Sequence, residues 1–206
     1  MRKVWLTAII LVVFFIGYWF FLRKPDTADE AQSITSQQPM KIGAHSLAFN
    51  NSIDTLLSAY FALKNNFVDA DSIAAAASAT KLAGLTDSVK MDELKKDTSA
   101  NATTLYATAV SQLVDVKTNA QSIPTEKTIT AMRKDFQSVT ESLYPLLKMI
   151  HYEGSILYLQ NCPMAFGDGN DANWISNTAE IMNPYLGKKD ITMYHCGETK
   201  DSIVGL

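Results

Sequence analysis

The sequence predicts a mainly α-helical protein: a four-helix up-down bundle with a small, irregular cap at its C-terminus, preceded by a single transmembrane helix. Three observations lead to this prediction. An uncharged apolar run lies near the start, apolar residues recur at helical spacing from about residue 50, and the last quarter is rich in Gly, Asn and Asp. Four amphipathic helices of about 100 residues in total can bury one core.

The first predicted element is a membrane anchor over residues 1–24. Arg2 and Lys3 precede an uncharged run from Val4 to Leu22, which at 1.5 Å rise per residue is roughly 28 Å long, about one hydrocarbon core. A cleavable signal peptide would end in small residues, whereas bulky side chains continue here up to Arg23. The basic flanks and the amino terminus favour a single pass that leaves the rest of the chain outside the cytoplasm.

A flexible tether is expected next, over residues 25–49, because its composition turns to Asp, Ser, Thr, Gln and Ala without an apolar period. If flexible, it spans roughly 25 to 30 Å root-mean-square. It contains Met40 and His45, and a lone histidine in a tether is interpreted as solvated. The folded domain is expected over residues 50–206.

The first two helices of the bundle are predicted over about residues 50–68 and 72–85. Apolar residues three and four apart give the first helix one apolar face. The second is rich in alanine, with Asp71 as a possible N-cap and Gly84 near its end.

The third helix is predicted as one element over about residues 91–121, ended by Pro124. The fourth follows from Ile129 to Ile150 and shows steps of three and four that mark a bundle seam. Met132 belongs to that seam, so it is assigned to core packing, and Pro145 is expected to kink the helix.

The cap, over about residues 153–206, is expected to contain one short strand at 155–159 and little other regular structure. Trp174 and Tyr185 are its predicted anchors on the bundle. A segment with so little regular structure needs a staple, which a metal ion or a disulfide could provide.

Two clusters in the cap supply the candidate ligands. Thiolate, thioether and imidazole groups favour a soft ion such as Cu(I) or Ag(I), with Zn(II) the commoner ion for sulfur and nitrogen alone. In an extended segment, Cys162 and Met164 would project to the same face. His195 and Cys196 would point apart unless the backbone turns there. The predicted metal ligands are Cys162, Met164, Met193, His195 and Cys196.

The alternative is a disulfide between the two cysteines of the chain, Cys162 and Cys196. Closing a loop of about 35 residues would stabilise the fold by roughly 3 to 4 kcal/mol in the chain-entropy model. Metal binding and disulfide formation are not exclusive, because oxidation would mask a reduced site. Both remain open at the level of sequence.

The chain also resembles a known family over roughly residues 50–206, most specifically in the order of short motifs in the cap. These are Leu157 to Phe166, Trp174 to Ser176, Ile181 to Gly187, Met193, and Cys196-Gly197. They resemble a bacterial family of helical domains of unknown function that also occurs at the C-terminus of Cus-type heavy-metal efflux adaptor proteins.

The resemblance implies an envelope-facing domain of a copper- or silver-handling system. Together with the predicted anchor, this gives a domain in the periplasm, tethered to the bacterial inner membrane. The resemblance also implies an efflux or copper-assembly protein as partner, and metal ligation by Cys162, Met164, Met193 and Cys196.

Composition excludes other classes of function. The net charge of −3 and pI near 5.6 provide no basic field for nucleic acid. No nucleophile elbow, phosphate loop, zinc-protease or haem motif occurs, so no enzymatic activity is expected. The sequence therefore favours a non-enzymatic, membrane-tethered domain that binds Cu(I) or Ag(I). The alternative is a structural or sensory helical domain, stapled by a disulfide, that binds a protein partner.

Overall fold

The computed structural model describes residues 39–205. The predicted anchor, residues 1–24, and the tether up to residue 38 lie outside this described part. Among the described residues, no helix is both long and apolar enough to cross a membrane.

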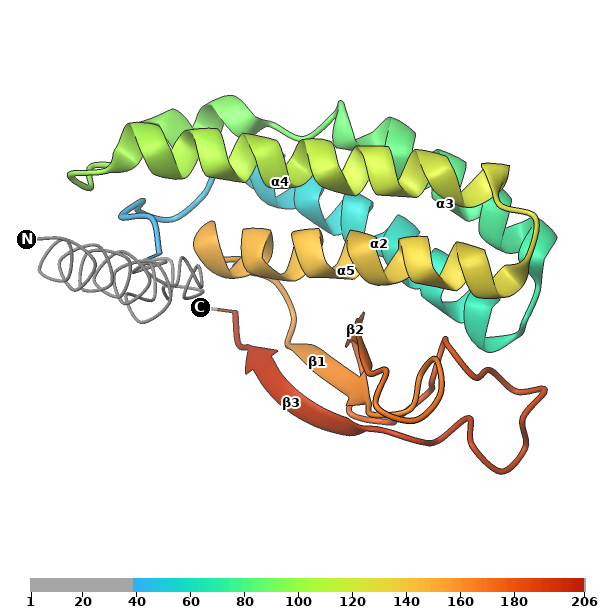
Figure 1. Ribbon diagram of the computed structural model, residues 1–206. Helices are drawn as coiled ribbons and strands as arrows, with labels where there is room; N and C mark the ends of the chain where they lie inside the picture. Colours follow the sequence, from blue (N-terminus) through green and yellow to red (C-terminus); the bar gives the residue numbers. More distant parts are fainter. Residues whose placement is uncertain (1–38, 206) are drawn as a thin grey trace, which may run out of the picture. The chain divides into compact units, whose positions relative to one another are not determined.

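The described chain is mainly helical, with a small three-stranded sheet. The helices are α2 (Leu47–Val68), α3 (Ser72–Thr86), α4 (Ala102–Ser122) and α5 (Ile129–Met149), with the short 3-10 helices η1 (Met91–Lys96) and η2 (Ile123–Thr125). Successive α-helices alternate in direction and pack on one another (Figure 1). Phe136 of α5 stacks on Tyr60 and lies against Phe67, both of α2, which closes the four helices into a bundle.

The second and fourth helices lie close to their predicted bounds, for clear local reasons. Asp71 caps α3 by accepting hydrogen bonds from the backbone N–H groups of Ile73 and Ala74. Thr128 caps α5 in the same way, through the N–H of Ala131. The α5 helix continues through Pro145, and its predicted seam is buried apart from Ile129, which is partly buried.

The third helix was predicted as one element over residues 91–121, and this is wrong. Asp97 interrupts it: its carboxylate accepts hydrogen bonds from the backbone N–H and hydroxyl of Ser99 and from the backbone N–H of Lys41. Side-chain bonds of this kind compete with helical ones. The chain therefore forms η1, leaves the helical path, and starts again as α4.

The last part of the predicted tether packs against the bundle. Met40 is 1% exposed and donates its backbone N–H to the carbonyl of Met149. The expectation that His45 is solvated is wrong, because its ring is buried, stacks on Phe49, and hydrogen-bonds through Nε2 to the carbonyl of Ile150. Helix α2 also begins three residues before the predicted start at residue 50.

The cap forms a sheet with strand order β2-β1-β3, in which both pairs are antiparallel. Its strands are β1 (Leu157–Cys162), β2 (Ala172–Ser176) and β3 (Glu198–Ile203). Only one strand was expected, at 155–159, and the observed β1 begins two residues later. The sheet lies along one side of the bundle, beside α5 (Figure 1).

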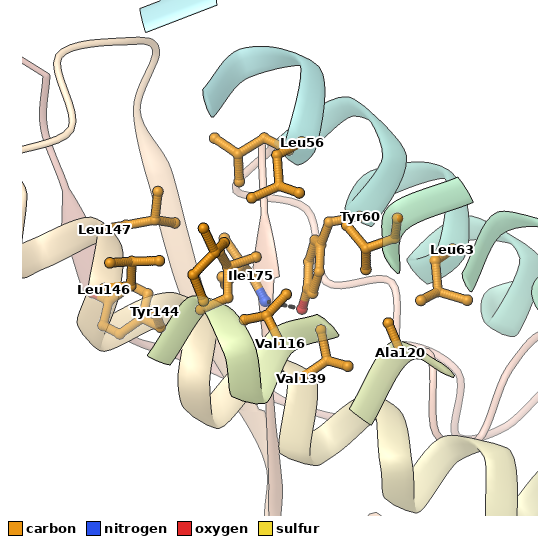
Figure 2. Close-up of a cluster of buried hydrophobic side chains, with 14 of the residues drawn as sticks. Leu56, Tyr60, Leu63, Val116, Ala120, Val139, Tyr144, Leu146, Leu147 and Ile175 are labelled. Atoms are coloured by element: carbon orange, nitrogen blue, oxygen red, sulfur yellow. Dashed lines mark hydrogen bonds between the residues drawn. The ribbon is translucent and has the colours of Figure 1, made fainter. Parts of the chain in front are cut away.

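A buried hydrogen bond ties the sheet to the helices. Tyr60 of α2 is fully buried, and its hydroxyl accepts the backbone N–H of Ile175 in β2 (Figure 2). The same hydroxyl contacts the Thr140 hydroxyl of α5. Burial raises the pKa of Tyr60 above its ordinary value. Its hydroxyl therefore remains protonated and serves as a neutral link between bundle and cap.

The loop before β3 is fixed to the carboxyl end of α2. The backbone N–H of Lys188 in this loop donates to the carbonyl of Val68 at 2.7 Å. Arg133 of α5 donates to the neighbouring carbonyl of Phe67 at 2.9 Å. Burial lowers the pKa of Arg133 to about 10. Gly187 has a φ of +71°, and a Cβ there would lie 3.0 Å from both carbonyl oxygens. Glycine thus permits the close approach of loop and helix.

Candidate functional site: a thiol pair in the cap

The two cysteines of the chain meet in the cap. Cys162 is the last residue of β1 and is fully buried, and Cys196 lies in the loop before β3 and is partly exposed. Their Sγ atoms are 3.0 Å apart, although the residues are 34 apart in sequence. Both are free thiols. The contact that a shared metal ion or a disulfide requires is therefore present.

The contact changes the acidity of the pair. The hydrogen bond to Cys162, together with burial, raises the pKa of the Cys196 thiol to about 11. The Cys196 thiol therefore stays protonated at neutral pH. A metal ion that binds both sulfurs must displace that proton, so metal affinity is expected to increase with pH.

Asn183 holds the loop that carries Cys196. Its buried side chain donates to the carbonyl of Cys196 at 2.9 Å and accepts from the backbone N–H groups of Tyr185 and Leu186, at 2.8 and 3.1 Å. Its backbone N–H donates to the carbonyl of Tyr194. One residue thereby joins the two ends of the loop and fixes the backbone at Cys196.

Gly197 allows the loop to enter the sheet next to β1. Its φ is +146°, a conformation that other residues rarely adopt. A Cβ at this position would lie 2.8 Å from the carbonyl oxygen of Asn161 and 2.8 Å from the ring of Trp174. The absence of a side chain lets the residue after Cys196 pack directly against the strand that ends in Cys162.

The predicted anchors of the cap, Trp174 and Tyr185, are both buried. Tyr185 packs against Phe136 of α5, Phe166 and Trp174, and its hydroxyl donates to the carbonyl of Asn173. Burial raises the pKa of Tyr185 well above its ordinary value. This aromatic cluster anchors the cap on the bundle core.

Met164 does not lie as predicted. The chain turns at Pro163 and Met164 instead of remaining extended, and the carbonyl of Met164 accepts the backbone N–H of Gly167. Met164 is 37% exposed, whereas Cys162 is fully buried. The premise that the two side chains share a strand face is therefore wrong.

Met193 and His195 lie on a turn that leads into Cys196. The backbone N–H of Cys196 donates to the carbonyl of Met193 at 2.8 Å. The chain therefore makes the turn without which the side chains of His195 and Cys196 would point apart. The Nδ1 atom of His195 donates to the carbonyl of Ile181 at 2.7 Å. In the neutral ring this leaves Nε2 with a free lone pair, the state in which histidine binds metals.

Of the five predicted ligands, the structure thus joins Cys162 and Cys196 and places Met193 and His195 on the turn before Cys196. Met164 follows Cys162 on an exposed turn. In the described range 39–205, no three His, Cys, Asp or Glu side chains lie close enough together to hold a metal ion. Asn183 was not predicted as a residue of the site, although an Asn before a Pro is a signal for a turn.

Replacing Asn183 with alanine is expected to lower the free energy of unfolding by about 1 to 3 kcal/mol, because buried backbone groups lose their partners. The loop should also release Cys196, so its reaction with a thiol reagent should become faster. Urea unfolding and timed thiol labelling measure the two effects. Asn177→Ala, at an exposed position, is the control and should change neither. Unchanged labelling of Asn183→Ala would contradict the proposed role.

Comparison with known protein families finds a match to the helical part of the chain. A model of the family described as protein of unknown function (DUF3347) matches residues 56–154. This range runs from α2 through α5 and confirms a helical domain of unknown function. The match ends before the thiol pair, so Cys162 and Cys196 lie outside it. No curated protein and no solved structure matches the chain.

Proposed function

We propose that the protein binds Cu(I) or Ag(I) through Cys162 and Cys196 and passes the ion to a partner protein. The observation that carries this proposal is the 3.0 Å contact between two free thiols, one buried and one partly exposed. Paired thiolates are preferred ligands of soft ions. The site lies beneath a loop fixed by Asn183, so its geometry is prepared before the ion arrives.

To share one ion, the two sulfurs have to move apart. With metal–sulfur bonds of about 2.3 Å, two sulfurs bound to one ion lie at most about 4.6 Å apart. The observed 3.0 Å is shorter than this, so the two side chains would rotate apart when an ion binds. The first two ligands therefore need no large rearrangement.

Further ligands can come from the residues next to the cysteines. Nε2 of His195 has a free lone pair, and Met193 lies on the same turn. Met164 is exposed and unbranched, so its thioether could move over an ion at Cys162. We assign Met193 and His195 as alternative third ligands, Met164 as a mobile one, and Zn(II) as a less favoured ion.

The cellular setting is part of the same proposal. The apolar run in residues 1–24 would anchor the domain in a bacterial inner membrane, with its soluble part in the periplasm. The resemblance to the C-terminal domain of Cus-type adaptors favours an efflux or copper-assembly protein as partner. The domain would act without catalysis, in metal efflux, delivery or resistance.

The second candidate function is a structural or sensory domain stapled by a disulfide, which binds a protein partner. The same sulfur contact favours it, because the bond would tie the end of β1 to the loop before β3. Titration of the reduced protein with Cu(I) against a competing chelator separates the two. Metal binding predicts one ion held per thiol pair and lost when both cysteines are serine. A stapled domain predicts no retention of the ion.

Met132→Leu tests whether binding belongs to the cap instead of the bundle seam. Met132 is 4% exposed within α5, so this variant should keep the Cu(I) affinity of the parent protein. Its free energy of unfolding should change by less than about 1.5 kcal/mol, because the two side chains have similar volumes. The chelator titration and urea unfolding measure both quantities. Reduced affinity would mean that the metal site lies in the bundle.

A further inference from the structure

We infer that the thiol pair undergoes thiol–disulfide exchange with an external disulfide, in which Cys196 reacts first and Cys162 completes the reaction. The inference goes beyond metal binding, since it assigns a different role to each sulfur. It depends on the proposed function only in its consequence for metal binding.

The two thiols differ in access. Cys162 ends the central strand of the sheet and is fully buried. The residue opposite it in β2 is Ala172, which is also buried. Cys196 lies outside the strands and is partly exposed. Exchange requires direct approach of the attacking sulfur to the disulfide. Only Cys196 offers that approach in the folded domain.

The reaction with a disulfide such as oxidised glutathione has two steps. Cys196 attacks one glutathione sulfur through its thiolate, a minor species at neutral pH because the pKa of this thiol is raised. A bond between these sulfurs forms, the glutathione disulfide breaks, and the departing sulfur takes up the proton that Cys196 released. Cys162 then attacks the sulfur of Cys196, and the second glutathione leaves as a thiol with the Cys162 proton. Two cysteine thiols are oxidised by two electrons, and one external disulfide is reduced to two thiols.

The fold favours the second step over release of the intermediate. The Cys162 sulfur already contacts the Cys196 sulfur at 3.0 Å, and a disulfide bond needs about 2.0 Å. Asn183 and Gly197 fix the backbone on either side of Cys196, so the two sulfurs remain neighbours. The mixed disulfide should therefore be short-lived in the parent protein.

Oxidation would also regulate the proposed metal site, because the disulfide has no thiolate to offer an ion. Under oxidising conditions the domain would release Cu(I) and not bind it again, and reduction would restore binding. This consequence rests on the proposed function, whereas the exchange reaction does not.

The test uses the reduced full chain without metal, exposed to oxidised glutathione, quenched with acid at intervals and measured by mass spectrometry. Cys162→Ser should accumulate one glutathione adduct, on Cys196. Cys196→Ser should form its adduct more slowly by on the order of tenfold or more, because Cys162 is buried. The parent protein should lose two hydrogen atoms and keep no adduct. Circular dichroism checks that both variants fold.

Equal rates of adduct formation in the two folded variants would overturn the inference, as would a stable adduct on the parent protein. If either variant fails to fold, peptide mapping of the parent after brief exposure decides: a transient adduct on Cys196 supports the inference, and one on Cys162 refutes it. A chain that exchanges but does not retain Cu(I) would refute the metal proposal alone. A chain that binds Cu(I) but does not exchange would refute only this inference.

Discussion

Cys162→Ser is expected to weaken Cu(I) binding far more than Met164→Leu. The first substitution removes an anionic thiolate from the buried half of the pair, and the second removes a neutral thioether on an exposed turn. Loss of an outer-shell partner alone typically costs 10- to 100-fold in metal affinity, so loss of a primary thiolate should cost more than about 100-fold. Met164→Leu should cost no more than about tenfold on the same scale.

Competition with a Cu(I) chelator under reducing conditions measures these affinities, and Met132→Leu serves as the matched control for a buried methionine. Equal and negligible effects of both cap substitutions would contradict a Cys-Met site. The disulfide interpretation would then predict that the protein, isolated without reductant, is lighter by two hydrogen atoms. A mass measurement before and after reduction decides this.

The sequence was a good guide where one periodicity dominated. The seam of α5, from Ile129 onward, and the start of α3 at Ser72 follow from repeat spacing and a capping Asp71. It was a poor guide where distant residues decide local structure. Asp97 breaks the third helix partly by binding Lys41, a contact across 56 residues that no local pattern contains.

The strands show the same limit. The strand β3, Glu198–Ile203, is polar except for its last residue and mostly exposed, so its sequence has no alternation of apolar and polar residues. It forms because β1 offers an unpaired edge opposite β2. His45 likewise has no local pattern that marks it as buried, and only the folded chain brings Phe49 and the carbonyl of Ile150 to its ring.

For the candidate site, the sequence paired Cys162 with Cys196, as metal ligands or as a disulfide, but it did not place the other predicted ligands. The contact between Cys162 and Cys196 was predictable because a cap with little regular structure requires a metal ion or a disulfide to hold it. Asn183 was missed because its role depends on three loop partners. Met164 was misplaced because Pro163 starts a turn, which an assumed strand geometry ignores.

Trp174→Ala is expected to lower the free energy of unfolding by about 3 to 5 kcal/mol, as typical for removal of a buried tryptophan. Its ring is fully buried in β2, meets Tyr185 edge to face with centroids 6.1 Å apart, and lies beneath Gly197. The ring thus fills the space between the sheet and the loop that carries Cys196.

The loss should concentrate in the cap, because Trp174 lies in the sheet, whereas Leu56, Val116 and Val139 pack between the helices (Figure 2). Hydrogen exchange of β1 and β2 should accelerate and Cys162 should become reactive to a thiol reagent, while helical circular dichroism persists. Trp174→Phe is the control: it keeps a ring and removes an indole N–H that has no partner among the described residues, so its loss should be smaller. Simultaneous loss of helix and cap would show instead that the bundle depends on the cap for its stability.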